Sequence, residues 1–300
     1  MYTPLISSQQ LQTLQASGQP LMVFDCSFEL MKPLEGDAHY LQAHVAGAVR
    51  ADLNRDLSHH PVRAELVEGA STSSARTDIA ASGGRHPLPS RAHFAQWLAS
   101  VGFDSRMQAV VYDRQGANYC GRLWWMLKWV GHEAVAVLDG GLQAWQAVGG
   151  TLSSGPEVPR AASRFTASQP KADLATTERV LQHLNQADQT VIDARATPRY
   201  RGEVEPLDPV AGHIPGALNR PFGLNLGPDG KFKSADQLKT EFLELLAGRD
   251  PSSVVHQCGS GVSALPNLLA MEIAGLGSSA LYAGSWSEWC GDAGRPVAKG

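Results

Sequence analysis

The strongest chemical signal in the sequence is Cys258, which stands between an apolar pair, Val254 and Val255, and a long apolar run from Ala264 to Gly275. The pair predicts a short buried strand, and the run has helical spacing with a glycine stop. Cys258 is therefore expected near a helix N-terminus, where free N–H groups and the helix dipole favour negative charge. The thiolate is the nucleophilic form of cysteine, so this position predicts nucleophilic catalysis.

Two glycines, Gly259 and Gly261, follow the cysteine within three residues. Glycine permits backbone angles that a β-carbon forbids, so successive amides of this loop can turn inward and form a cradle for an anion. A free cysteine is more often a small buried apolar residue. A purely structural cysteine needs neither glycine, however, and the loop therefore favours a chemical role for Cys258.

Composition limits the class of protein. Three hundred residues with 43% hydrophobic content suit one large or two medium domains. A net charge of −4 gives no basic footprint for nucleic acid or an anionic membrane. No apolar run reaches the ~18 residues of a membrane span, and Met1–Gly18 lacks the plan of a signal peptide. The four cysteines show neither a CxxC pair nor metal-ligand spacing, so we expect a cytoplasmic protein without metal or cofactor.

The chain also contains an internal duplication. Val110–Asp113 corresponds to Val254–Gln257 at an offset of 144 residues, and the same offset superposes Gly131 on Gly275, Gly140 on Gly284 and Trp145 on Trp289. A constant register over this length indicates two copies of one domain. Short apolar strands alternate with helical stretches at His93–Val101, Leu123–Val130 and Ala235–Leu246. Each copy is therefore predicted to be an α/β domain with a mainly parallel sheet flanked by helices.

Linker composition divides the two copies. We expect an N-terminal domain at 1–150, a linker rich in serine, glycine and proline at 151–165, and a C-terminal domain at 166–300. The first copy has extra length around 54–85, which predicts a surface loop that could fold over the other domain. At the position of Cys258 the first copy carries Arg114, so only the C-terminal copy is expected to be catalytic.

Taken together, these residues resemble the two-domain sulfurtransferase, or rhodanese, family over nearly the whole chain. The resemblance is carried by the tandem His-x-x-Gly-Ala turns at His44 and His213, by Leu123-Trp124-Trp125-Met126, Leu138-Asp139-Gly140-Gly141 and Gly284-Ser285-Trp286-Ser287-Glu288-Trp289, and by the cysteine loop itself. It implies two tandem rhodanese-like domains. The uncharged Gly259-Ser260 pair is similar to the mercaptopyruvate branch, because thiosulfate enzymes place basic residues there, which suit a dianion.

The resemblance implies a sulfurtransferase that moves sulfur from 3-mercaptopyruvate, through a persulfide on Cys258, to a thiol acceptor such as thioredoxin or to cyanide, and releases pyruvate. Arg199 matches the position that binds the substrate carboxylate, with Arg201 as a helper. The remaining substrate contacts are expected from the loop, at Gly259, Gly261, Val262 and Ser263.

A Ser–His–Asp relay in the family maps onto Ser260 and His86 as further catalytic residues. Asn54 stands where its aspartate is expected, and Asp52 or Asp56 could substitute. Mercaptopyruvate enzymes often carry a second arginine where this chain has Leu207, so the keto acid is expected to be anchored more weakly or differently.

Other functions remain as alternatives. Thiosulfate sulfurtransferase activity is the runner-up, and a non-catalytic binding module is a third possibility. A cysteine phosphatase needs an arginine six residues after the cysteine, where Ala264 stands, so this class is disfavoured. The resemblance implies a monomer or weak dimer.

Overall fold

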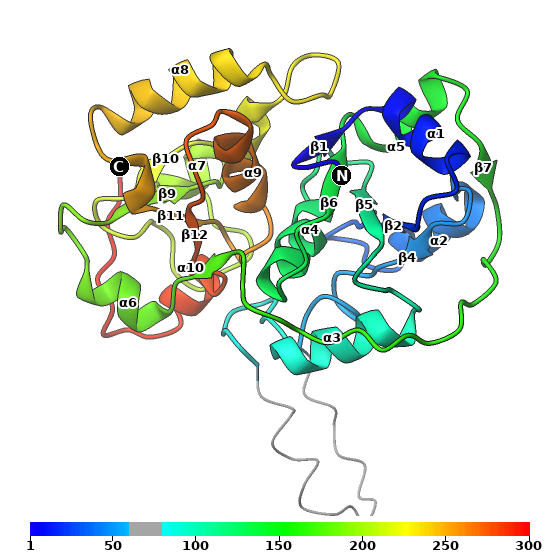
Figure 1. The fold of residues 1–300 in the computed structure, drawn as a ribbon. Coiled ribbons are helices and arrows are strands. Elements are labelled where there is room, and N and C mark those ends of the chain that lie inside the picture. The colour runs from blue at the N-terminus through cyan, green and yellow to red at the C-terminus, as the bar shows by residue number, and fades with distance from the viewer. Residues whose placement is uncertain (60–79) are drawn as a thin grey trace, which may run out of the picture.

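The computed structural model describes residues 1–59 and 80–300, which form two α/β units lying side by side (Figure 1). The first unit has a parallel five-stranded sheet in the order β1-β6-β5-β2-β4. Its strands are β1 (Leu5–Ile6), β2 (Leu21–Asp25), β4 (Val49–Arg50), β5 (Gln108–Tyr112) and β6 (Val135–Leu138). Its helices are α1 (Ser8–Ala16), α2 (Glu35–Gln42), α3 (Arg91–Ser100), α4 (Cys120–Trp129) and α5 (Gly141–Ala147).

The second unit repeats this design with the strand order β10-β9-β11-β12-β8, again with all neighbours parallel. Its strands are β8 (Asp173–Leu174), β9 (Thr190–Asp193), β10 (Leu218–Asn219), β11 (Val254–Gln257) and β12 (Ala280–Leu281). Its helices are α6 (Thr177–Gln182), α7 (Thr197–Tyr200), α8 (Ala235–Leu246), α9 (Leu265–Ile273) and α10 (Ser285–Trp289), with 3₁₀ turns η2 (Phe222–Asn225) and η3 (Pro251–Ser253). The predicted α/β fold class with two parallel sheets is confirmed.

The register of the duplication extends to the backbone. The residue at the sharp bend after the central strand has a positive φ in both units, 65° at Ala117 and 72° at Gly261. The residue that begins α5 or α10 does so too, with 59° at Gly141 and 55° at Ser285. Both pairs are separated by the offset read from the sequence, so the loops that follow the two central strands are structural equivalents.

The central strand β11 fixes the position of Cys258. All four residues of β11 are buried, and the strand pairs with β9 on one side and β12 on the other. Parallel sheets are covered by helices on both faces, which explains why apolar Val254 and Val255 suit this strand. Cys258 follows at the carboxyl end, the edge at which open α/β sheets usually bind ligands.

The two units pack through α4 and α9, which face each other in the middle of the molecule (Figure 1). A β-carbon placed on Gly121 would lie only 3.0 Å from the β-carbon of Leu265, and Lys128 forms an ion pair with Glu272 across the same contact. One hydrophobic core contains buried side chains of both units, including Trp124 of the first and Cys258, Val262 and Ala264 of the second. The loop is thus supported from the first unit.

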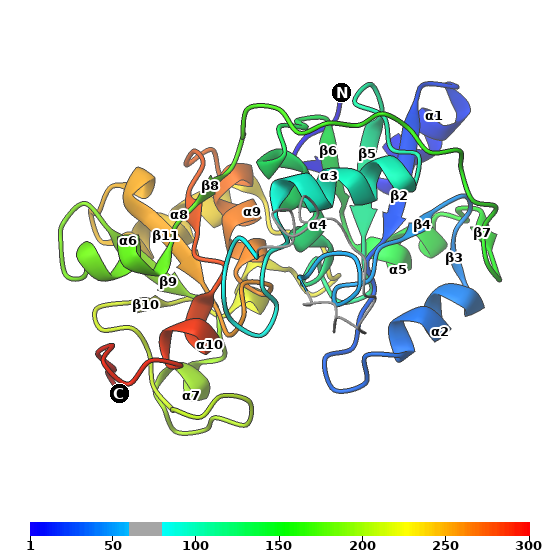
Figure 2. The same ribbon diagram turned by 90° about the horizontal axis from the view of Figure 1, so that it is seen from below.

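The segment between the units runs along the first of them (Figure 2). Strand β7 (Leu152–Ser153) pairs antiparallel with β3 (His44–Val45), and the amide of Ser163 donates to the carbonyl of Ala99 in α3 (2.8 Å). The chain then enters β8. The division at 150 and 165 stays a prediction.

Candidate active site

Cys258 is almost fully buried, with 2% of its surface exposed, and its backbone is held by α10. The Cys258 amide donates to Oγ of Ser285 (3.1 Å), and the Cys258 carbonyl accepts from the amide of Trp286 (3.0 Å). The carbonyl of Gly259 accepts from the amide of Ser287 (2.9 Å). The first turn of α10 therefore fixes the start of the Cys258 loop, defined here as residues 258–264.

The amides of this loop differ from their equivalents in the first unit. There, the Asp113 carboxylate accepts four amide hydrogen bonds, from Gln115, Ala117, Tyr119 and Cys120, at 2.8–3.0 Å. In the second unit Gln257 occupies the position of Asp113, and its side-chain nitrogen and oxygen are buried with no partner among the described residues. None of the amides from Gly259 to Ala264 donates to any residue that the structure describes. The first cradle is filled by a carboxylate of the chain itself, whereas the second is open to an anion.

The two loop glycines are needed for different reasons. Gly261 has a φ of +72°, and a β-carbon there would lie 2.1 Å from the carbonyl oxygen of Ala283. Gly259 does not have a positive φ. A β-carbon at Gly259 would instead lie 2.9 Å from Nη2 of Arg85 and 3.5 Å from Nη1 of Arg199. The sequence suggested special backbone angles for both glycines, but only Gly261 has a positive φ, whereas a β-carbon at Gly259 would crowd the end of the Arg85 side chain.

The predicted pair Ser260 and His86 is brought together across the two units. Nδ1 of His86 lies 2.7 Å from Oγ of Ser260, and both side chains are buried. His86 belongs to residues 80–88, which continue from the extra length of the first unit and pack on the second. The amide of Gly83 donates to Glu288 (3.1 Å), and the amide of Arg85 donates to Oγ of Ser287 (3.1 Å).

The described residues do not identify an acidic third member for a relay with Ser260 and His86. Asp52 accepts the amides of Asn54 and Arg55 (2.9 Å each) and pairs with Arg50 (3.0 Å). Asp56 accepts the amide of Asp52 (2.8 Å). These carboxylates cap the turn after β4. A relay role for Asp52 or Asp56 stays a prediction, as does the extent of the extra loop, because residues 60–79 lie outside the described residues.

Arg199 and Arg201 differ in their surroundings. Nη2 of Arg199 pairs with Glu205 (2.6 Å) and Asp208 (3.3 Å), while its Nε is buried without a hydrogen-bond partner in the described part of the chain. Arg201 is exposed and lies 3.8 Å from Glu203. Arg199 therefore faces the Cys258 loop with spare donors, and the helper role of Arg201 stays a prediction. Val262 is buried and Ser263 is partly exposed, both at the turn into α9.

Sequence reasoning missed two arginines of the first unit. Arg85 pairs with Asp208 and reaches Gly259. Arg122 in α4 is fully buried and donates to the carbonyls of His86 (2.8 Å) and Gly261 (3.1 Å). The one available signal was the charged Arg122 beside the apolar Leu123–Trp125 stretch, which marks a buried polar contact.

Two buried arginines, Arg122 and Arg195, lie close enough to Cys258 to interact electrostatically with it. Burial lowers the pKa of Arg122 to about 9, and the neighbouring Cys258 acts in the opposite direction. Burial also opposes the charge of Arg195, but Asp193, Glu205 and Cys258 outweigh it and raise its pKa. Both cations therefore remain charged at neutral pH.

The other cysteines have a different environment. Burial raises the pKa values of the Cys26 and Cys120 thiols well above the ordinary value, with nearby Asp25 and Asp113 acting in the same direction. Burial likewise raises the pKa of Cys290. Protonated thiols are poor nucleophiles, so Cys26, Cys120 and Cys290 are disfavoured as nucleophiles.

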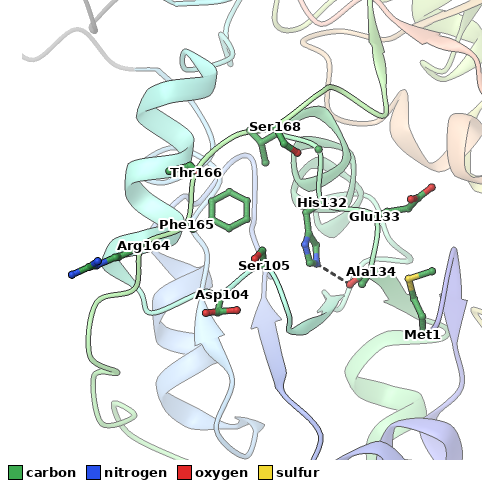
Figure 3. Close-up of a pocket in the computed structure, with 12 residues that line it drawn as sticks. Met1, Asp104, Ser105, His132, Glu133, Ala134, Arg164, Phe165, Thr166 and Ser168 are labelled. Atoms are coloured by element: carbon green, nitrogen blue, oxygen red, sulfur yellow. Dashed lines mark hydrogen bonds between the residues drawn. The ribbon is translucent and has the colours of Figure 1, made fainter.

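A separate cavity of about 480 Å³ lies on the first unit and contains none of these groups (Figure 3). It is lined by Met1, Asp104, Ser105, residues 130–134, Arg164, Phe165, Thr166 and Ser168. Its histidine, His132, lies 3.1 Å from the carbonyl of Ala134, and burial lowers the pKa of the ring. An uncharged histidine on a backbone carbonyl fits a structural role.

Comparison with known proteins agrees with this geometry. The family described as "Rhodanese-like domain" matches residues 7–148 and 176–292. The chain belongs to the rhodanese family. A Pseudomonas aeruginosa protein named "Probable 3-mercaptopyruvate sulfurtransferase" is 44% identical over 99% of this chain and 98% of its own length. The "Thiosulfate sulfurtransferase" of Bos taurus is 33% identical over 96% of this chain and 92% of its own length.

A solved rhodanese-family structure also resembles the chain. The "3-mercaptopyruvate sulfurtransferase from Leishmania major" superposes with a TM-score of 0.78 at 30% identity, covering 96% of this chain and 74% of that one. The two matched segments of the family correspond to the two units, so the tandem rhodanese repeat predicted from the duplication is confirmed.

Proposed function

We propose that this rhodanese-family chain is a 3-mercaptopyruvate sulfurtransferase that carries sulfane sulfur on Cys258. Relatives named for that activity support the donor. The observation that carries the proposal is the open amide loop. Its equivalent in the first unit is filled by Asp113, whereas the amides after Cys258 have no partner among the described residues. A cradle of free amides next to a cysteine suits a thiolate and a terminal persulfide sulfur.

In the first half-reaction the Cys258 thiolate attacks the sulfur of 3-mercaptopyruvate. A sulfur–sulfur bond forms, the carbon–sulfur bond breaks, and its electron pair leaves with the three-carbon fragment as the enolate of pyruvate. The enolate carbon then takes a proton, which yields pyruvate. The enzyme keeps a persulfide whose outer sulfur lies among the amides of the loop.

Two groups would assist this step. Arg199 would orient the substrate carboxylate through its spare donors, as a charge-assisted hydrogen bond. Ser260 and His86, at 2.7 Å from each other, would hold or move the proton at the carbonyl oxygen of the substrate. No metal or cofactor is needed for this balance of bonds and charges.

In the second half-reaction an acceptor thiolate attacks the outer sulfur and leaves with it, which restores the Cys258 thiolate. A small thiol protein such as thioredoxin would serve, and cyanide would form thiocyanate. No helix within residues 1–59 and 80–300 has the length and apolar character required to cross a membrane. We further propose a cytoplasmic location and a monomer or weak dimer.

The test measures kcat/KM for 3-mercaptopyruvate and for thiosulfate with cyanide as the acceptor, together with the mass of the protein after exposure to each donor. We expect preference for mercaptopyruvate and a gain of about 32 Da, one sulfur, on the peptide that contains Cys258. Cys258→Ser should keep the fold and lose turnover with both donors. Full turnover by that variant would refute the proposal.

Thiosulfate is the second candidate donor. Two guanidinium groups approach Gly259, and a dianion gains more than a monoanion from two cations. The named Bos taurus relative supports this reading. A higher kcat/KM for thiosulfate in the same assay would establish it and overturn the first candidate.

A further inference from the structure

The proposed donor carries a carboxylate, whose two oxygens can accept hydrogen bonds from two guanidinium groups. Leu207, in the loop that follows Arg199, offers no cation. The Leu207 amide instead donates to Glu205 (3.1 Å), so its loop serves to hold the acid that pairs with Arg199. A second cation must come from elsewhere if the carboxylate is gripped by two groups.

Arg85 of the first unit is in the required place, and its backbone is fixed there. Its amide donates to Oγ of Ser287 (3.1 Å) in α10. The preceding Gly84 lies so close to α10 that a β-carbon on it would be 2.6 Å from the carbonyl oxygen of Gly284. Two successive residues are thus docked on the helix that also holds the backbone of Cys258.

The guanidinium groups of Arg85 and Arg199 are arranged alike. Each has one terminal nitrogen on Asp208: Nη1 of Arg85 on Oδ1, and Nη2 of Arg199 on Oδ2. Each directs its other terminal nitrogen to Gly259, where a β-carbon would be 2.9 Å from Arg85 Nη2 and 3.5 Å from Arg199 Nη1. Asp208 therefore holds both guanidinium groups in place, with one edge of each directed toward Gly259, the residue next to Cys258.

Exposure separates the cations from their acids. The side chains of Arg85 and Arg199 are 28% and 19% exposed, whereas those of Asp208 and Glu205 are 3% exposed. An incoming anion can therefore reach the arginines, and the acids behind them are shielded. Nε of Arg199 is buried and has no hydrogen-bond partner within the described ranges.

From this arrangement we infer that Arg85 is a substrate-binding residue, the second arginine that grips the carboxylate of the sulfur donor together with Arg199. The inference rests on the proposed function for the identity of the donor. We call Arg85 and Arg199 together the carboxylate clamp. It spans both units, since Arg85 belongs to the first and Arg199 to the second. It takes a small anion with a carboxylate a few atoms from the reacting sulfur.

The test compares the alkylation of Cys258 by iodoacetate and by iodoacetamide. The two reagents have nearly the same size and react at the same carbon, but only iodoacetate carries a carboxylate. Their rate ratio at Cys258, measured by mass spectrometry of the peptide, reports the clamp without any sulfur transfer. Arg85→Gln should lower the iodoacetate to iodoacetamide ratio about tenfold, and should lower kcat/KM for mercaptopyruvate by about tenfold to a hundredfold.

Two further variants separate binding from structure. Arg85→Lys retains the positive charge but not the two parallel N–H donors of the guanidinium group. We therefore expect an iodoacetate to iodoacetamide ratio between those of wild type and Arg85→Gln. Arg106→Gln removes one positive charge from an exposed pair with Asp104 in the same unit and should leave the ratio unchanged. If Arg85 only joins the units, Arg85→Gln will slow both reagents equally or lower the melting temperature with an unchanged ratio, and the inference is then wrong.

The two proposals can fail separately. If Arg85→Gln lowers the iodoacetate to iodoacetamide ratio as expected but the wild-type protein does not use mercaptopyruvate, the role of Arg85 stands and the proposed donor is wrong. A protein that uses mercaptopyruvate with full efficiency after Arg85→Gln would retain the function and lose the clamp.

Discussion

Arg122 offers the sharpest test of how the first unit supports the site. It is fully buried in α4, and no described carboxylate forms an ion pair with it. Its guanidinium donates to the carbonyl of His86 (2.8 Å) and to the carbonyl of Gly261 in the Cys258 loop (3.1 Å), with longer contacts to Leu57 (3.4 Å). We expect Arg122→Met to separate activity from stability.

The effect on stability follows from two opposing quantities. Burial lowers the pKa of Arg122 to about 9, so keeping its charge inside the protein costs free energy, and the substitution removes this cost. The two short hydrogen bonds contribute about 1.5–3 kcal/mol each, and these are lost. The costs nearly cancel, so the free energy of unfolding should change by no more than about 2 kcal/mol.

The effect of Arg122→Met on kcat/KM has no compensating gain of this kind. Without Arg122, the carbonyls of His86 and Gly261 lose their shared donor, and Cys258 loses a neighbouring positive charge. A displacement of about 1 Å at reacting groups costs about a hundredfold in rate. We therefore expect kcat/KM for mercaptopyruvate to fall about a hundredfold, and alkylation of Cys258 by iodoacetamide at neutral pH to slow.

The assay pairs thermal unfolding with the two rate measurements. Lys128→Met is the matched control, because Lys128 lies in the same helix and bonds the second unit at Glu272 but not the Cys258 loop. It should lose little activity. If Arg122→Met folds poorly, Arg122→Lys takes its place in the assay. Lysine retains the charge, so its kcat/KM should lie between the wild-type value and the roughly hundredfold loss expected for Arg122→Met. Activity within about threefold of wild type in folded Arg122→Met would refute the reasoning.

Three further substitutions test the loop. Arg199→Ala should lower kcat/KM for mercaptopyruvate by about one to two orders of magnitude, because it removes a charge-assisted hydrogen bond, and an unchanged efficiency would contradict the role of Arg199. Gly261→Ala should lower the free energy of unfolding by roughly 3 kcal/mol, measured by denaturant titration, because the φ of +72° is strained for alanine and the new β-carbon meets the Ala283 carbonyl. Gln257→Asp should place a carboxylate where Asp113 stands in the first unit and occupy the loop amides, so turnover should fall at least about a hundredfold. Gln257→Asn, with the size of aspartate but no charge, is its control, and equal activity of the two would show that the loop is not an anion cradle.

The sequence predicted those features that depend on local pattern. The helix at Ala235–Leu246 was predicted with the observed bounds, and the strand predicted from Val254 and Val255 lies within β11. The helical stretches predicted at His93–Val101 and Leu123–Val130 correspond to α3 and α4, with ends displaced by one to three residues. Their apolar spacing and glycine stops are properties of neighbouring residues. Because the duplication has a constant offset, a strand or helix predicted in one unit also predicts its equivalent in the other. The fold class follows from this repetition of alternating strands and helices.

Contacts between the units were beyond that reasoning. Arg85 and Arg122 lie in the first unit, and no spacing in the sequence reveals that they approach Gly259 and Gly261. His86 was found only through the resemblance, because its partner Ser260 is distant in the chain. Contacts between residues of different units depend on how the units pack through α4 and α9. The side chains at that interface determine the packing.

The duplication explains why the unit without a nucleophile is retained. A loop of inward amides must be matched by an anion, and the first unit supplies Asp113, with Arg114 turned aside to Asp25 (3.1 Å). That unit can no longer bind an external anion in its own loop. Its α4 and residues 80–88 instead lie over the open loop of the second unit, where Arg85, His86 and Arg122 complete the surroundings of Cys258. The second unit alone would retain Cys258 but lose Arg85, His86 and Arg122, so under the proposed function we expect the isolated second unit to be inactive.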